Sequence, residues 1–300
     1  MHLETFRTFC DVVETGSLSA AARVSRVTQS AVSQQLRTLE QRYGQRLIER
    51  APRTQARPTE AGELLYRELK PLLAAFADLD AKLHARRNLL EGGVLEGSVR
   101  VATVYSVGLH TLPPVIKEFL RTHRAVKVRM EYRRTDLIYA ACLSGELDFG
   151  IVALPARRAQ LTSVPLFEDE LVLALPPDHR LASQRRPSLK ALDGELFVAF
   201  DRDIPTRRLI DKLLRQHHTS VQVAMELDNI ETIKRSVEAG LGLSILPAPA
   251  LQNEVRAGTL ATRPLREGPF RRPIAAIHRR GRELSAPARA LLEMLAKSGV

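Results

Sequence analysis

The sequence predicts two fold classes in one chain: an all-α N-terminal part that ends in a long helix, and a C-terminal α/β part of two Rossmann-like subdomains. Apolar residues recur at helical spacing through the first sixty positions and then at heptad spacing as far as residue 90. From residue 98 onward, short apolar runs alternate with helical segments, which is typical of α/β domains. The chain of 300 residues is long enough for two or three domains.

Composition and charge narrow the class of protein. Hydrophobic residues make up 44% of the chain, and no apolar run approaches the roughly 20 residues that a membrane-spanning helix needs. The N-terminus carries acidic residues and no cleavable signal pattern, so we expect a cytoplasmic protein. The net charge of +11 favours an anionic partner such as nucleic acid, the alternative being simple solubility. Two isolated cysteines, Cys10 and Cys142, predict neither a disulfide framework nor a metal site, and we expect no cofactor.

Three short helices are predicted before residue 44, and the last two form a helix-turn-helix pattern. The first is amphipathic and ends at Gly16, and the second covers residues 18–24. A turn of three to four residues leads to Thr28, which is a good N-cap, and Gly44 ends the third helix. Short helices in this order, with a tight turn before the last one, are typical of DNA-binding modules.

The outer face of the third helix carries hydrogen-bonding side chains where a solvated face usually carries mixed charges. They are Thr28, Gln29, Ser30, Ser33, Gln34 and Arg37. These groups can hydrogen-bond to base edges and phosphates, so we expect the face to read double-stranded DNA. Residues 23–57 contain eight arginines and two glutamates, a net charge of +6 that suits binding to a phosphate backbone. Residues 49–62, with two prolines and three arginines, predict an exposed hairpin over that backbone, a wing.

A long helix with a heptad pattern is predicted over residues 59–90. Seven of its eight seam positions are apolar, at residues 65, 69, 72, 76, 79, 83 and 90. Because a seam of this length needs a partner helix, we expect it to pair two subunits into a homodimer. The alternative is a core helix within one chain. Pro71 predicts a kink, and three glycines predict a hinge over residues 91–97.

The C-terminal part, residues 98–300, predicts an α/β domain with mostly parallel sheets. Strands and helices alternate from residue 98 to residue 155, and five further apolar runs follow as strands. The chain is expected to cross between two subdomains near residues 162–168 and to return near residues 264–270. These crossings predict subdomain I over 98–164 and 267–300, and subdomain II over 165–266.

Three strand ends that precede helix starts predict a small-molecule site. In open α/β sheets, ligands bind beyond the carboxyl ends of strands, and free amides at a helix start favour anions. The candidate side chains are Thr103, Tyr105, Ser106, Phe200, Asp201, Thr206, Asn229 and Thr232. Ordinary helix capping is the alternative for each, but three sets at the expected ends favour a shared cleft. The same loops hold no catalytic arrangement such as a GxSxG elbow or a matched Cys/His pair.

The chain resembles the LysR-type transcriptional regulators over essentially its full length. Three N-terminal segments match that family's signature in order and spacing: FRTFCDVVETGSLSAAA, TQSAVSQQLRTLEQRYGQRLIER and PTEAG. Three C-terminal segments resemble the effector-binding domain of that family: SGELDFGIV, PDHRLA and VEAGLGLSILP. The stretch VATVYSVGLHTLPPVIKEFL, followed by EYRRTDLIY, resembles the subgroup of the family that regulates sulfur assimilation or inorganic-carbon fixation.

The resemblance implies a winged helix-turn-helix, a linker helix that pairs subunits, and a regulatory domain of periplasmic-binding-protein type II. It implies dimers of dimers that respond to a small metabolite, and the strand ends described above predict that this metabolite is polar or anionic. Effector binding is expected to close the subdomains and so to change DNA bending and contact with RNA polymerase. The resemblance places the six outer-face residues of the third helix in the major groove and Arg53 in the wing. Tyr105 is bulkier than the family's usual small residue, so it narrows the cleft or faces the ligand.

Two other functions fit parts of the sequence. A cytoplasmic α/β enzyme with a helical accessory module is one, and the missing catalytic arrangement argues against it. A solute-binding protein is the other, and the basic helical N-terminus argues against that.

Overall fold

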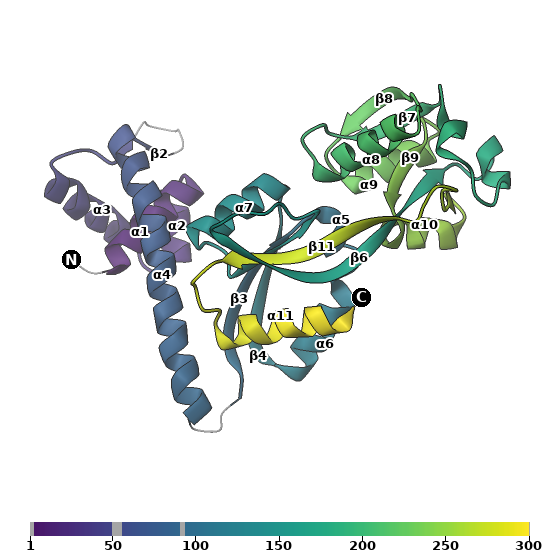
Figure 1. Cartoon of the computed structure of the whole chain (residues 1–300). Helices are drawn as coiled ribbons and strands as arrows, with labels where there is room; N and C mark the ends of the chain where they lie inside the picture. Colours follow the sequence, from purple (N-terminus) through teal and green to yellow (C-terminus); the bar gives the residue numbers. More distant parts are fainter. Residues whose placement is uncertain (1–2, 50–55, 91–93, 300) are drawn as a thin grey trace. The chain divides into compact units, whose positions relative to one another are not determined.

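The computed structural model describes residues 3–49, 56–90 and 94–299, without the side chains at 78, 81, 82 and 84–90 (Figure 1). Its contacts divide the chain into two compact units, Met1–Leu83 and His84–Val300. Among the described residues, no helix is both long and apolar enough to cross a membrane.

The N-terminal unit contains the predicted helix-turn-helix. Its elements are α1 (Leu3–Thr15), α2 (Leu18–Val24), α3 (Gln29–Tyr43), β1 (Ile48–Glu49), β2 (Arg57–Pro58) and the first part of α4 (Glu60–Leu90). The Thr28 hydroxyl accepts a hydrogen bond from the Ala31 amide at 3.2 Å, which caps α3. Gly44 ends the helix in the left-handed conformation, with φ of 63°. Both predicted ends of this helix are therefore confirmed.

The short strands β1 and β2 pair antiparallel and bracket the segment for which a wing was predicted. Residues 50–55, at the tip of that expected hairpin, lie outside the described residues. The core of the unit packs one side of α1, α2 and α3 against Leu47, Ile48 and Leu69. Burial of these apolar faces fixes which side of α3 is left to solvent.

Helix α4 runs unbroken through Pro71, where a kink was predicted. Its heptad positions divide into two groups. Leu69 is buried in the N-terminal core, and Leu65 packs against it. Leu72, Phe76, Leu79 and Leu83 are exposed by 64%, 43%, 52% and 58%. The second group is an apolar seam that this chain by itself leaves uncovered.

The C-terminal unit is built on a seven-stranded mixed sheet in the order β10-β6-β11-β5-β3-β4, with β9 also paired to β6. The strands are β3 (Glu96–Thr103), β4 (Ala125–Tyr132), β5 (Phe149–Ala153), β6 (Leu161–Leu175), β9 (Ser244–Pro247), β10 (Ala261–Arg263) and β11 (Phe270–Arg279). In the part of this sheet that the structure describes, β3 pairs in parallel with β4 and with β5, and every pairing of β6 and β11 is antiparallel. The expectation of mostly parallel sheets is therefore wrong, because two long strands return alongside each other.

Subdomain I surrounds the parallel strands. Its helices are α5 (Tyr105–Gly108), α6 (Pro113–Thr122), α7 (Thr135–Ser144) and α11 (Ala286–Ser298). Alternate residues of β3 serve opposite faces: Val99 and Val101 join a core with α6 and α11, while Ala102 joins a core with α7. Strand β3 begins at Glu96, so the last two residues of the predicted hinge belong to the sheet.

Subdomain II has its own core and a second small sheet. The sheet pairs β7 (Leu196–Phe200) in parallel with β8 (Gln222–Leu227). The helices are α8 (Pro205–Gln216), α9 (Ile230–Glu238) and α10 (Gln252–Ala257), with 3-10 turns η1 (Arg180–Ser183), η2 (Leu189–Leu192) and η3 (Ala248–Leu251). This core includes the C-terminal half of β6.

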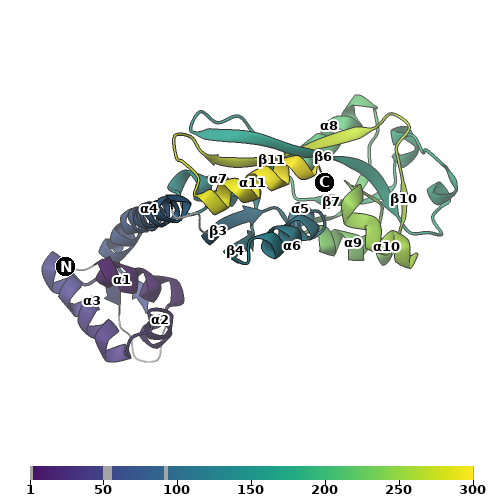
Figure 2. The ribbon, with the colours of Figure 1, turned by 90° about the horizontal axis from the view of Figure 1, so that it is seen from below.

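The two subdomains share the long strands β6 and β11. Figure 2 shows these strands passing side by side from one subdomain into the other. Leu166 and Ile274 belong to the core of subdomain I, whereas Leu171 belongs to that of subdomain II. A register shift interrupts the pair between Ile274 and Ala275. The shift lies at the end of subdomain I, where Ile274 and Ala275 also pair with β5.

Candidate functional site

The outer face of α3 presents the predicted hydrogen-bonding residues to solvent. Thr28, Gln29, Ser30, Gln34 and Arg37 are exposed and Ser33 is half-buried. The opposite stripe, Val32, Leu36 and Leu39, is buried. Among the described residues, no carboxylate pairs with Arg37, so its guanidinium is available to a base or a phosphate.

Exposed arginines surround this face. Those that the structure describes are Arg23, Arg26, Arg37, Arg42, Arg46 and Arg57. Of the two glutamates in the region, Glu40 is engaged inside the unit, because its carboxylate accepts the amides of Leu47 at 3.0 Å and Ile48 at 3.3 Å. Arg53, the predicted wing contact, lies outside the described residues. The region thus combines a positive field with a face of hydrogen-bond donors and acceptors, as DNA recognition requires.

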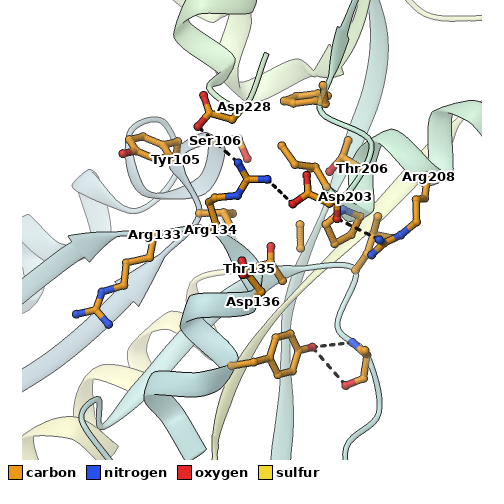
Figure 3. Close-up of a pocket in the computed structure, with 18 of the residues that line it drawn as sticks. Tyr105, Ser106, Arg133, Arg134, Thr135, Asp136, Asp203, Thr206, Arg208 and Asp228 are labelled. Atoms are coloured by element: carbon orange, nitrogen blue, oxygen red, sulfur yellow. Dashed lines mark hydrogen bonds and ion pairs between the residues drawn. The ribbon is translucent and has the colours of Figure 1, made fainter. Parts of the chain in front are cut away.

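A cavity of about 320 Å³ lies between the two subdomains of the C-terminal unit (Figure 3). Four predicted effector contacts line it: Tyr105, Ser106, Phe200 and Thr206. Tyr105 also stacks on Tyr132, with ring centroids 5.6 Å apart. The helix starts at α5 and α8 therefore converge on one cleft.

The other four predicted contacts do not line the cavity. Thr103 is fully buried in the sheet. Asp201 lies behind the rim, 3.4 Å from Arg134. Asn229 caps α9 by accepting the Glu231 amide at 2.9 Å, and the Thr232 hydroxyl donates to the Asn229 carbonyl at 2.7 Å. Capping, the alternative weighed for these residues, explains the last two.

Sequence reasoning missed the charged lining of the cavity. Five arginines and three aspartates line it: Arg133, Arg134, Arg158, Arg208, Arg272, Asp136, Asp203 and Asp228. The rule that ligands bind beyond strand ends could have found Arg133 and Arg134, because they follow β4 and precede α7. No comparable local signal marks Arg272, which lies within strand β11.

Arg272 forms the floor of the cavity. Its side chain is 2% exposed and pairs with Asp169, which is 3% exposed, through one terminal nitrogen. The other terminal nitrogen donates to the hydroxyls of Ser106 at 3.2 Å and Thr206 at 3.3 Å. Its Nε is buried and finds no hydrogen-bond partner among the described residues. Arg272 therefore connects both shared strands with the first turns of α5 and α8.

Further polar contacts, at Arg134 and His110, join the subdomains. Arg134 Nη2 donates to Asp203 across the rim (Figure 3), and this hydrogen bond raises the pKa of Arg134. His110 Nε2 lies 2.7 Å from Glu231 Oε1. Polar contacts therefore join the two subdomains at the cleft, in addition to the shared strands and the packing of Tyr105 against the core of subdomain II.

The two thiols are not placed for chemistry. Burial raises the pKa of Cys10 and of Cys142 to about 12. A thiol is nucleophilic as its thiolate, so both behave as small buried apolar groups. The described part of the chain contains no cluster of three or more His, Cys, Asp or Glu side chains arranged to hold a metal ion.

Comparison with known proteins agrees with this architecture. Residues 3–63 match the bacterial regulatory helix-turn-helix proteins of the lysR family, and residues 92–299 match the LysR substrate binding domain. The RuBisCO operon transcriptional regulator of Allochromatium vinosum is 27% identical over 98% of this chain and 95% of its own length.

Two solved structures share the fold. Full-length CbnR with its target DNA aligns with a TM-score of 0.73 at 21% identity, covering all of both chains. The regulatory domain of Synechocystis CcmR, solved with 2-PG, aligns with a TM-score of 0.63 at 25% identity over 68% of this chain and 98% of that domain. The matching family and these relatives are transcriptional regulators. The chain belongs to the LysR family and is a DNA-binding transcriptional regulator with a C-terminal effector-binding domain.

Proposed function

We propose that this regulator reads an operator of two half-sites in the cytoplasm as a homodimer, and that a small polar or anionic effector in the cleft changes its action. The observation that carries the proposal is the exposed, uncharged hydrogen-bonding face at the start of α3, surrounded by arginines. The N-terminal residues of a recognition helix are those that reach base edges in the major groove. CbnR, which shares the fold, has been solved on its target DNA, and this supports the placement.

Gln29, Gln34 and Arg37 have the chemistry to discriminate bases. Glutamine pairs with two positions of adenine and arginine with two of guanine, each pair contributing about 1–3 kcal/mol of discrimination. Thr28, Ser30 and Ser33 are short, so they suit phosphates or the edge of a single base. Arg53, in the expected wing, suits the phosphate backbone. Its contribution is the same for every sequence.

Self-association follows from the apolar seam of α4. A single chain leaves Leu72, Phe76, Leu79 and Leu83 in solvent, and a second copy of the same helix would cover them. Two such dimers would form the tetramer that the family resemblance implies. Effector binding would change the spacing of the paired DNA-binding units, and so DNA bending and contact with RNA polymerase.

The effector proposal rests on the cavity and on one relative. Synechocystis CcmR has been solved with 2-PG in its regulatory domain, and the arginine-rich lining here suits ligands with acidic groups. The Allochromatium relative is named for the RuBisCO operon. Promoters of inorganic-carbon genes, and the sulfur-assimilation promoters that the sequence resemblance names, are therefore the first places to search for operators.

A nuclease footprint on the DNA upstream of the protein's own gene and on those promoters tests the proposal. We expect an inverted repeat to be protected in the presence of excess random DNA. Gln29→Ala should reduce the preference for the operator by about 5- to 150-fold, in line with the loss of one base contact. Gln41→Ala is the matched control, because Gln41 is an exposed glutamine about 18 Å further along α3.

Two results would contradict base reading. One is diffuse protection that disappears with modest salt, which would mean electrostatic binding alone. The other is an equal loss of affinity for operator and random DNA when Gln29 is changed.

A further inference from the structure

Arg134 lies at the rim of the cavity and is surrounded by carboxylates of the opposite subdomain. It follows β4 and precedes α7 in subdomain I. Its guanidinium donates to Asp203 and lies 3.8 Å from Asp228 (Figure 3). It also lies 3.4 Å from Asp201, and all three aspartates belong to subdomain II. Three negative charges thus lie around the one positive charge of Arg134.

This cluster is easy to rearrange. The side chains of Asp203 and Asp228 are 64% and 58% exposed, and that of Arg134 is 37% exposed. Ion pairs between side chains with this much contact with water contribute little free energy, because water solvates the separated charges well. A ligand that offers Arg134 a better-placed anionic group can therefore replace the aspartates.

The rest of the lining favours an anion. Arg158 and Arg208 pair with no carboxylate among the described residues. Arg208 donates to the backbone carbonyl of Asp203, and Arg158 lies over the ring of Tyr139 at 4.3 Å.

The helix starts at the cavity and the floor of the cavity also favour an anionic ligand. Helices α7 and α8 begin at the cavity, and neither has a side-chain cap for its first amides. The buried guanidinium of Arg272 also has an unpartnered Nε in the floor. The cavity therefore offers positive groups at both rim and floor. The aspartates on Arg134 oppose an anion, as does Asp136, which also lines the cavity.

We propose that Asp203 and Asp228 compete with a small anionic effector for Arg134, so that these carboxylates set both the affinity for the effector and the closure of the cleft. The inference rests on the proposed function, since it concerns the same cleft. The ligand class is a small molecule with carboxylate or phosphate groups, because both match the planar donors of arginine. A cavity of about 320 Å³ lies at the small end of ligand sites. Binding moves Arg134 from subdomain II to the ligand and releases one of the contacts between the subdomains.

The competition has a signature that ordinary ligand contacts lack. Removing a contact residue weakens binding, whereas removing a competitor strengthens it. We expect Asp203→Asn and Asp228→Asn each to raise affinity for the anion about two- to fivefold, as the loss of an exposed ion pair allows. Arg134→Gln should lower affinity more than about tenfold, because it removes a charged hydrogen-bond donor.

The full-length protein is titrated calorimetrically with inorganic phosphate in one arm and malonate in the other, at constant ionic strength. The two arms separate phosphate from carboxylate ligands. Asp203→Asn is then repeated in the Arg134→Gln background, where we expect no gain. An equal gain in both backgrounds would assign the effect to the general field of the cavity and overturn the competition.

Further results of these titrations also test the competition for Arg134. Unchanged or weaker anion binding by both asparagine variants would overturn the proposal, as would the absence of phosphate and malonate binding by all variants. Operator binding is measured separately by footprinting. A protein that protects its operator but fails these titrations would retain the proposed function and lose this inference. The opposite pattern would retain anion competition and remove the regulatory proposal.

Discussion

At the scale of single residues, Gly62 permits the close approach of α4 to the chain that follows α3. A Cβ at this position would lie 2.0 Å from the Leu47 carbonyl oxygen, which also accepts the Thr59 amide at 3.0 Å. That oxygen belongs to the backbone, so it cannot move aside as a flexible side chain would. Gly62→Ala should therefore destabilise the N-terminal unit by about 1–3 kcal/mol, despite the higher helix propensity of alanine.

Urea unfolding followed by far-ultraviolet circular dichroism measures this effect. Arg67→Ala, at an exposed position of the same helix, is the control and should change stability by no more than about 0.5 kcal/mol. A stability of Gly62→Ala equal to that of the control would mean that α4 can shift away from Leu47 at no cost.

The thiols allow a second prediction at this scale. With pKa values of about 12, Cys10 and Cys142 carry a thiolate in roughly one molecule in ten thousand at pH 8. We expect neither to react with iodoacetamide in the native protein and both to react in urea, as followed by intact mass. The folded state holds these protons more tightly than the unfolded chain, whose thiols ionise near pH 9.0. Their contribution to stability is therefore complete below pH 9.0 and falls as the pH rises toward 12. A native adduct would reveal local opening.

At the scale of elements, the exposed seam of α4 predicts the oligomeric state. Leu72 and Leu79 lie two turns apart on one side of the helix. Burying each leucine against a partner contributes about 1.5–3 kcal/mol. The double variant Leu72→Ser/Leu79→Ser should therefore be monomeric at concentrations where the unaltered protein is dimeric. Sedimentation velocity distinguishes the two states.

Ala77→Ser is the matched control for the seam. Ala77 is exposed on the opposite side of the same helix, so the substitution adds the same hydroxyl away from the leucines. Dimers that survive in the double serine variant would show that another surface pairs the subunits. Loss of helix content in that variant would be visible by circular dichroism.

At the scale of the whole molecule, the buried pair Arg272–Asp169 ties the shared strands to both subdomains. Arg272→Leu leaves the Asp169 carboxylate buried without its partner and should cost about 3–5 kcal/mol. Replacing both residues by leucine should recover most of that stability, because it removes the unpaired charge. Thermal and urea unfolding measure both effects.

The neighbouring pair provides the control. Arg271 lies 3.4 Å from Glu168 one step along the same strands, but both side chains are largely exposed. Arg271→Leu should cost no more than about 1 kcal/mol. Similar costs at positions 271 and 272 would mean that burial does not distinguish the two pairs.

Local signals were enough for much of the fold. Thr28 and Gly44 set the ends of α3 through contacts within four residues, so the sequence could predict them. The start of β6 at Leu161 depends on pairing with Arg279, more than a hundred residues away, and no local pattern marks it. Three-residue β10 likewise depends on the edge of β6.

The residues of the site also divide into those that local sequence predicts and those that it does not. Ser106 and Thr206 follow strand ends, and that rule places them at the cleft. Arg272 becomes a site residue because β6 sets Asp169 directly opposite it in the antiparallel register. A charged residue within one strand cannot reveal which residue a distant strand will place beside it. The place of Arg272 in the cleft therefore depends on the assembled sheet.

The sharing of β6 and β11 has a consequence for genetics. Strand β11 lies between β6 and β5, and α11 covers the face of subdomain I that carries Val99 and Val101. A nonsense codon anywhere in subdomain II removes both elements, so it destroys subdomain I as well. Selections for alleles that keep a folded regulatory domain but no longer sense the effector should therefore return missense changes alone.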